Sequence, residues 1–238
     1  ISGKFRFRNM RLEIARLRAK HDKTLLALDQ GTVDVNPRGG YYARFEDLQM
    51  QGLRLDDEFL QALPGKLQTA ARSLKLKDAI RVKTQIIIAQ PPETGKPPDV
   101  YWDGQAWLYG AGITTGLEFT NVTGTLACVG RYDGRQIVGV DGNVVLERAT
   151  LFKQPFKDVH AKFQIRENSP DLLVVGLRAP IFSGDITGQL RVELNSTLRY
   201  EMNLTASQIN LAEFGRHNLG PKSQISGAAS ARLYLAGL

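Results

Sequence analysis

Strict alternation of apolar and polar residues between Ala179 and Leu211 is the feature that most constrains how this chain can fold. A period of two directs alternate side chains to opposite faces of a β-strand, so the apolar members share one face and the charged members share the other. The apolar members are Ile186, Leu190, Val192, Leu194, Leu198, Tyr200, Met202, Leu204 and Ala206. The segment therefore predicts a β-hairpin with one apolar and one wet face.

The same alternation recurs in several other parts of the chain. It covers residues 122–132, 140–146, 159–165, 173–179 and 229–235. Turn signals lie between such segments, namely "NPRGG" at 36–40 and the Asp-Gly pair at 132–135, which is typical of a hairpin. A second Asp-Gly pair at 140–143 fits either a hairpin or a bend or bulge within a strand. The pattern predicts an antiparallel sheet with one buried face.

Residues 55–79 depart from this pattern and favour helix. Asp56 or Asp57 can cap a short helical turn, and Pro64 suits the first position of a second helix that runs to about Leu74. Leucine and alanine at three-to-four spacing give this segment an apolar stripe. We expect a helical segment near 56–75 that covers part of the sheet or plugs one end of it.

A proline-rich stretch at 91–98 is the one plausible internal boundary in the sequence. It divides the chain into a basic β segment at 1–90, which contains the helical insert at 56–75, and a repeated β segment at 99–238. No stretch approaches the roughly 20 apolar residues of a membrane span. Because the alternating pattern runs up to both termini, we expect the chain to be a piece of a longer polypeptide with its membrane anchor elsewhere.

Positive charge is concentrated in the first third of the chain. Residues 1–83 carry 17 Lys and Arg against 10 Asp and Glu, whereas residues 84–238 carry 14 of each. The basic segment fits a nucleic acid or anionic lipid partner, or simply a solvated strand edge that Lys and Arg protect from pairing. We favour the solvated edge. Phe5 and Phe7 fall on one strand face, so they fit inward-facing residues as well as a nucleic acid platform.

Residues that carry enzyme chemistry do not form a recognisable constellation. His21, His160 and His217 are far apart and lack a second ligand at metal spacing. The chain has no nucleophile elbow and no phosphate-binding loop. Cys128, the one cysteine, fits a small core residue of a strand. These observations predict a protein that is not an enzyme and that has no cofactor, no metal site and no nucleic acid partner.

A short step of Ile or Val, Ser or Thr, and Gly occurs four times, each time before a strand-like segment. The glycines of these steps are Gly3, Gly124, Gly188 and Gly227. Glycine inside a strand marks a bulge, a bend or a close backbone approach. We interpret Gly184 and Gly188 as bend points, because a bend at matching places would let successive strands curve in the same direction.

The C-terminal half of the chain combines these features in a fixed order. A strand is followed by a small-Gly-x-Ile-x-Gly step, by two strands that close on Ile-Asn-Leu, and by a final alternating strand. These parts are Leu173–Ala179, Ser183–Gly188, Gln189–Leu194, Leu198–Leu211 and Ser226–Gly237. The order resembles the AsmA-like family, which includes TamB-type envelope proteins, over about residues 156–238 and more weakly before them.

This resemblance implies a fold and a function. Relatives are Gram-negative envelope proteins with an inner-membrane helix and a long periplasmic β structure, a curved, taco-like sheet with a hydrophobic groove. They are thought to carry or bridge phospholipids between the two membranes, or to support outer-membrane assembly. The resemblance therefore implies a periplasmic location, a phospholipid or other acyl-chain partner, and anchorage through a helix outside this chain. It brings no catalytic residues.

We accordingly expect an all-β fold, a long curved antiparallel sheet with one short helical segment. One helix of ~11 residues is only ~16 Å long and cannot cover such a sheet. The apolar face then serves a lipid, or it lies against a second sheet in a structural β-sandwich or β-solenoid of a surface protein. Strand parity predicts a lipid groove lined by Ile186, Leu190, Val192, Leu194, Leu198, Tyr200, Met202, Leu204, Leu233 and Leu235.

Overall fold

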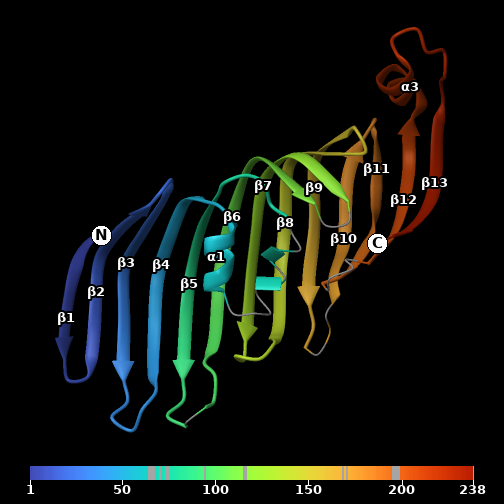
Figure 1. Cartoon of the computed structure of the whole chain (residues 1–238). Coiled ribbons are helices and arrows are strands. Elements are labelled where there is room, and N and C mark those ends of the chain that lie inside the picture. The colour runs from blue at the N-terminus through green and yellow to red at the C-terminus, as the bar shows by residue number, and fades with distance from the viewer. Residues whose placement is uncertain are drawn as a thin grey trace.

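The computed structural model describes residues 1–238 except 64–67, 70, 73–74, 94, 115–116, 168, 170, 195–198 and 238. The described strands form one 13-stranded sheet whose spatial order is the order in the sequence (Figure 1). Every neighbouring pair is antiparallel, so the chain runs as an uninterrupted meander. The sheet does not close, and β1 and β13 remain as its two edges. The expected long antiparallel sheet is therefore confirmed.

The strands are long, and most contain ten or more residues. They are β1 (Ser2–Arg8), β2 (Arg11–His21), β3 (Thr24–Val35), β4 (Tyr41–Leu53), β5 (Ile80–Gln90), β6 (Asp99–Thr114), β7 (Glu118–Tyr132), β8 (Ile137–Leu151), β9 (Gln154–Ile165), β10 (Asp171–Ile181), β11 (Gly184–Glu193), β12 (Tyr200–Asn210) and β13 (Ala228–Gly237). Among the described residues, two short helices accompany them, α1 (Asp57–Ala62) and α3 (Leu211–Leu219).

Tight turns hold consecutive strands together. The predicted hairpin at 132–135 joins β7 to β8, where the Asp133 carboxylate accepts backbone N–H groups of Arg135 and Gln136, both at 2.8 Å. These bonds hold the pKa of Asp133 below its ordinary value. The second Asp-Gly pair, Asp141-Gly142, lies inside β8 and keeps regular register with β7 and β9, so it forms neither a hairpin nor a bulge. Residues 36–40 form the turn between β3 and β4.

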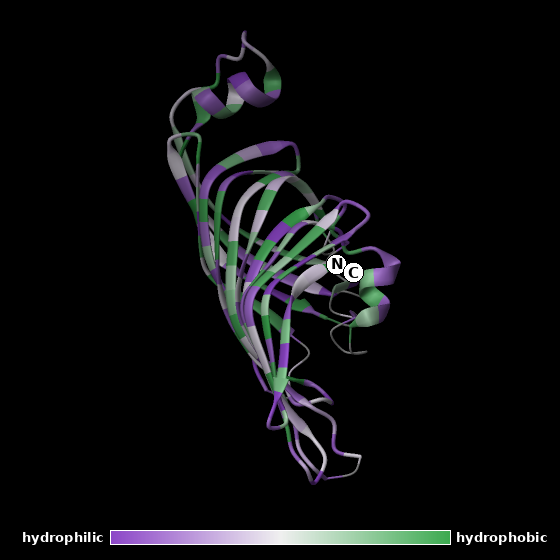
Figure 2. Cartoon of the chain, turned by 90° about the vertical axis from the view of Figure 1, so that its left-hand side faces the viewer, coloured by the Kyte–Doolittle hydropathy of each residue, from purple (hydrophilic) through white to green (hydrophobic). Residues whose placement is uncertain are grey.

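The sheet is bowed along the length of its strands (Figure 2). Most strands contain an irregularity at which one residue adopts a left-handed conformation, a feature of β-bulges that increases bending. These residues are Arg16, Asp47, Gly110, Asn121, Asp158, Gly176 and Gln208. Of the two expected bend points, Gly188 keeps regular register with β12, and the nearest bulge is at Gly176 on β10.

Helix α1 lies on the concave side of the sheet (Figure 2). Asp56 caps it by accepting the backbone N–H of Phe59 at 2.9 Å, which the sequence predicted as one of two possible caps. Phe59 packs against a cluster of buried residues that includes Leu53 and Ile80. The helix thus covers one part of the concave face. Most of the second predicted helix, from Pro64 to about Leu74, lies outside the described residues.

Helix α3 was not expected from the sequence. It follows β12 directly, and the Asn210 side chain caps it by accepting the N–H groups of Ala212 and Glu213. Phe182, in the β10–β11 turn, meets Phe214 of α3 edge to face. The sequence therefore underestimates the helical content, because "INLAEF" completes an alternating strand with residues that also begin a helix.

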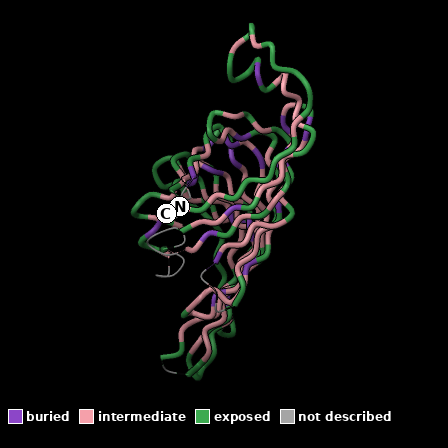
Figure 3. Tube along the Cα trace, turned by 90° about the vertical axis from the view of Figure 1, so that its right-hand side faces the viewer, coloured by how far each residue is buried: buried purple, intermediate pink, exposed green. Residues whose placement is uncertain are grey.

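The residues 91–98 connect β5 to β6, and those two strands pair directly from Arg81–Trp107 to Ala89–Asp99. The sheet is therefore continuous across the expected boundary. Buried positions are spread over β3 to β12 rather than gathered in one interior, and β1, β2 and β13 contain none (Figure 3). This distribution is what a single-layer sheet produces when side chains of neighbouring strands cover one another.

Candidate functional site

One face of the sheet is apolar from one edge to the other. Residues directly opposite each other in register share a face, so the pairing can be followed across all strands. One such row consists of Phe5, Ile14, Gly31, Phe45, Ile86, Trp102, Gly130, Val140, Ile165, Leu172, Val192, Tyr200 and Gly237. It contains only apolar residues, tyrosine and glycine. We call the face that carries this row the apolar face.

Neighbouring rows have the same character. One runs through Ala19, Leu26, Met50, Val82, Ala106, Leu126, Val144 and Ala161. Within the paired positions that the structure describes, this face carries no Asp, Glu, Lys or Arg side chain. Leu53 and Ile80, members of the cluster against which Phe59 of α1 packs, also belong to it. Because α1 lies on the concave side, the apolar face is the concave one (Figure 2).

Most of the residues predicted from strand parity lie together on this face. In β11, Ile186, Leu190 and Val192 pair with Ala206, Met202 and Tyr200 of β12. Beyond them, Met202 pairs with Leu235 and Leu204 with Leu233 of β13. Val192 and Met202 are 1% and 3% exposed, whereas Leu233 at the open edge is 50% exposed. Leu194 follows the end of β11 and is half-buried, and Leu198 lies outside the described residues.

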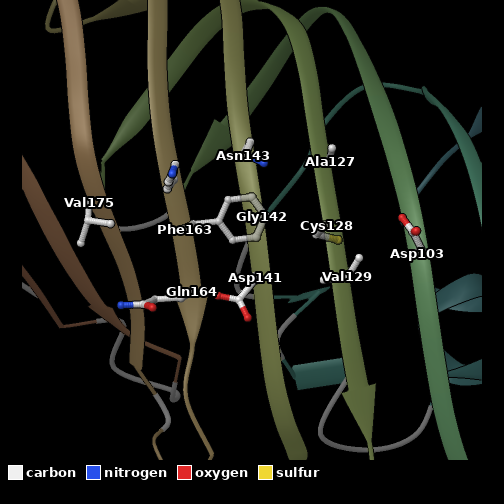
Figure 4. Close-up of a pocket in the computed structure, with 11 residues that line it drawn as sticks. Asp103, Ala127, Cys128, Val129, Asp141, Gly142, Asn143, Phe163, Gln164 and Val175 are labelled. Carbon is white, nitrogen blue, oxygen red and sulfur yellow. The ribbon is translucent and has the colours of Figure 1, made fainter.

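Aromatic rings and glycines pair repeatedly across the strands of the apolar face. The ring of Phe163 in β9 extends over Gly142 of β8 (Figure 4), and Trp102 in β6 lies over Gly130 of β7 in the same way. Tyr200 and Gly237 form a third pair at the C-terminal edge. A side chain at any of these glycines would collide with the ring. The rings therefore cover the backbone of the glycines, so the apolar face is flat and has no gap at these positions.

The opposite face is polar and carries the ion pairs between strands. Lys83 bonds Asp47 at 2.7 Å, and Arg191 bonds Asp171 at 2.6 Å. The Asp171 hydrogen bond raises the pKa of Arg191 above its ordinary value. Lys83, Asp47 and Arg191 are partly exposed to water, whereas Asp171 is buried beside Arg191. The position of these ion pairs identifies this face as the one in contact with solvent.

A shallow hollow of about 400 Å³ lies on this polar face, above the middle of β7, β8 and β9 (Figure 4). The polar residues Asp103, Asp141 and Asn143 line the hollow, together with the smaller side chains of Ala127 and Val129. No three His, Cys, Asp or Glu side chains converge as a metal site requires, in the described part of the chain. The hollow therefore offers polar contacts but no recognisable catalytic arrangement.

Cys128 belongs to the apolar face, opposite Gly104 and Gly142. Burial raises the pKa of its thiol, so the thiol stays protonated and is a poor nucleophile at neutral pH. The three histidines lie on different elements, with His21 at the end of β2, His160 in β9 and His217 in α3. The structure brings none of these residues into a common site.

Sequence reasoning missed the central part of the apolar face. Ile86 and Trp102 pair near the middle of the sheet, but the run of three isoleucines at 86–88 hides which of them points inward. Only the register resolves this, since Ile87 pairs with Tyr101 on the polar face. Alternation on the flanking residues Val82 and Thr84 was the one available signal.

Comparison of the chain with protein-family models, with curated proteins and with solved structures gives no match. Among the described residues, no helix has both the length and the apolar character needed to span a bilayer.

Proposed function

We propose that this chain is a non-enzymatic lipid-binding segment whose apolar face holds the acyl chains of phospholipids. The observation that carries the proposal is the charge-free, concave apolar face, which no second sheet covers within the described residues. Exposed apolar surface of this extent is characteristic of a binding surface rather than of a solvated monomer. Each methylene group that moves from water onto it gains about 0.8 kcal/mol.

The dimensions of the apolar face support an acyl-chain ligand. Thirteen strands at ~4.8 Å spacing extend about 60 Å across the sheet. The hydrocarbon core of a bilayer is ~30 Å thick, so an acyl chain that reaches its midplane spans about 15 Å. The face is therefore long enough for several acyl chains in succession. Headgroups would stay in water along the open side.

A conducting role follows from the same geometry. Because the apolar face is uniform from β1 to β13, an acyl chain meets no charged barrier as it moves from strand to strand. The proposed setting is the periplasm of a Gram-negative-type envelope, where such a segment would carry phospholipid between the inner and outer membranes and support outer-membrane biogenesis. Anchorage would come from a helix outside this chain.

The alternative is a structural segment of a surface protein with no lipid ligand. A β-sandwich of this kind needs a second sheet about 10 Å from the first. The described strands all belong to one sheet, so such a partner sheet would have to come from outside the described residues. We therefore favour the lipid-binding role.

The proposal is tested by extracting lipid from the purified protein and by native mass spectrometry. We expect bound phospholipid in the wild-type protein and much less in the Leu233→Asp and Leu190→Asp variants. Each variant has a matched control on the polar face of the same strand. Tyr234→Asp, next to Leu233 and similarly exposed at 60%, and Gln189→Asp, next to Leu190, should retain the wild-type amount.

Absence of bound lipid from the wild-type protein, even after incubation with phospholipid vesicles, would contradict the proposal. Equal lipid loss in both members of a matched pair would do the same, because the effect would then not depend on the face.

A further inference from the structure

The segment between β4 and β5, which contains α1, takes up part of the apolar face (Figure 2). We call the described residues of 54–79 the insert. Within the insert, Phe59 and Leu76 pack against the sheet, and Leu60 is 6% exposed. The buried cluster that they pack against comes from β4 to β8 and consists of Leu53, Ile80, Leu108, Ala111, Val122 and Ala149. On these strands the insert therefore occupies the place that a ligand of the apolar face would take.

Polar bonds fasten the insert near both of its ends. Near its start, Glu58 bonds His21 at the end of β2 at 3.1 Å. Near its end, the backbone N–H of Lys77 donates to the carbonyl of Gly112 in β6 at 3.1 Å. The N–H of Gly112 in turn donates to the Asp78 carboxylate at 3.0 Å. The insert is thus held against the sheet by bonds that an acyl chain, which has no donors or acceptors, cannot replace.

The continuous row of the apolar face, which runs from Phe5 to Gly237, lies outside this cover. Phe45, Ile86 and Trp102 are its members on β4 to β6, and all three are half-buried and lie outside the buried cluster. Trp102 is separated along β6 by about 13 Å from Ala106, which does pack against the cluster. On the strands under the insert, the apolar face is therefore divided into a covered part and a partly exposed part.

We propose that the insert is a barrier that keeps acyl chains on the continuous row and off the covered part of β4 to β8. This inference rests on the proposed lipid-binding function. An acyl chain on the row removes exposed apolar surface from water, which is favourable. On the covered part it would only take the place of Phe59 and Leu76, and it would break the bonds of Glu58 and Asp78 without replacing them. The insert therefore directs lipid along one lane across the sheet.

The test compares two phenylalanines of the apolar side by photocrosslinking to lipid. Phe45 belongs to the continuous row, whereas Phe119 packs against the buried cluster. The neighbour of Phe119, Glu118, bonds Lys77 of the insert at 3.1 Å. Photoreactive benzoylphenylalanine replaces Phe45 or Phe119 in the full chain, which is irradiated with vesicles of phosphatidylethanolamine and phosphatidylglycerol. We expect crosslinked phospholipid at Phe45 and only background at Phe119, as measured by mass spectrometry.

Loosening the insert should open the covered part to lipid. In the Phe59→Ala/Asp78→Ala variant, we expect crosslinking at Phe119 to rise to the level seen at Phe45. Crosslinking at Phe45 should stay unchanged, which shows that the sheet is still folded. Phe152→Ala removes an exposed phenylalanine from the β8–β9 turn and is the matched control, in which Phe119 should stay at background. If the double variant loses crosslinking at Phe45, Asp78→Ala alone takes its place, and the rise at Phe119 is still expected.

The possible failures of this experiment can be told apart. Crosslinking at both positions, or at Phe119 alone, without loosening of the insert would overturn the barrier and leave lipid binding intact. No rise at Phe119 in a loosened variant that keeps crosslinking at Phe45 would also overturn it, because the insert would then only complete the core of the sheet. Crosslinking at neither position would contradict the proposed lipid-binding function itself, and the inference with it.

Discussion

At the scale of single residues, glycine is as important to the apolar face as the large apolar side chains. Gly31, Gly130, Gly142 and Gly237 each lie opposite an aromatic residue on this face. The aromatic ring occupies the space above the glycine backbone, so a long stretch of sheet stays covered without a second layer. Acyl chains laid on this surface would meet ring faces and short aliphatic groups rather than exposed backbone.

The pair of Gly142 and Phe163 gives a prediction about stability. Gly142→Ala would place a methyl group against the Phe163 ring and the Ala127 backbone, so we expect a loss of about 1–3 kcal/mol in the free energy of unfolding. Adding Phe163→Leu should recover part of that loss, because the smaller side chain can yield. Denaturant unfolding of the two single variants and the double variant measures the coupling. Additive effects would show that the ring does not lie over the glycine.

The residues of the candidate site were predictable where alternation is strict. Leu190 and Met202 lie in β11 and β12, and their polar neighbours fix which face each occupies. The register shifts at Gly3 and Gly124 fall on glycines of the repeated step, as the sequence indicated. Other bulges were not predictable, because Arg16, Asp158 and Gln208 adopt left-handed conformations without being glycine. Such residues are held by the surrounding register rather than by their own backbone preference. Local sequence therefore predicts the face of a side chain better than the bend of its strand.

At the scale of elements, α1 lies on the concave side of the sheet and is joined to the sheet by side-chain contacts. Phe59 supplies the apolar contact with the sheet, and Glu58 bonds His21 at the end of β2 at 3.1 Å. The hydrogen bond with Glu58, followed by its negative charge, raises the pKa of His21 above the ordinary value. The contact therefore depends on the charge of His21.

The pair of His21 and Glu58 makes the stability of the protein depend on pH. Because the folded-state pKa of His21 is raised, the pair stabilises the protein fully below the unfolded-state pKa of ~6.5. The contribution is lost as pH rises through the folded-state value. We expect Glu58→Gln to lower the His21 titration midpoint, measured by NMR, and expect its stability to approach that of the wild type as pH rises. Glu213→Gln, which removes a bond to Ser183 instead, should leave the His21 midpoint unchanged.

The outcome for the two helices shows where element prediction from sequence succeeds. Asp56 begins α1 as expected, since a capping carboxylate followed by acidic residues leads into an apolar stretch. Asn210 is the N-cap of α3, but the triplet Ile209-Asn210-Leu211 is also compatible with the end of a strand. Tertiary contacts of the helix, such as that of Phe214 with Phe182 and the hydrogen bond of Ser183 to Glu213, distinguish a strand that stops from one that continues.

At the scale of the whole molecule, the meander topology makes the order of the strands easy to predict from sequence. The number of strands that remain in one sheet is difficult to predict. Each strand pairs with its neighbours in sequence, so local alternation and turns determine the order of the sheet. Whether thirteen such strands fold into two facing sheets or remain one depends on long-range packing, which alternation does not encode. The single sheet leaves the apolar face uncovered over most of its length, and this is the basis of the proposed function.

The two tryptophans of the chain allow the most direct test of where lipid binds. Trp102 lies on the apolar face opposite Ile86 and Gly130, whereas Trp107 lies on the polar face opposite Arg81, whose guanidinium is 5.1 Å from its ring. Bromine quenches indole fluorescence only near contact. Phospholipid brominated in its acyl chains should therefore quench Trp102, observed in the Trp107→Phe variant, and leave Trp107 unquenched in the Trp102→Phe variant. Equal quenching of both residues, quenching of Trp107 alone, or quenching of neither would contradict a lipid site on the apolar face.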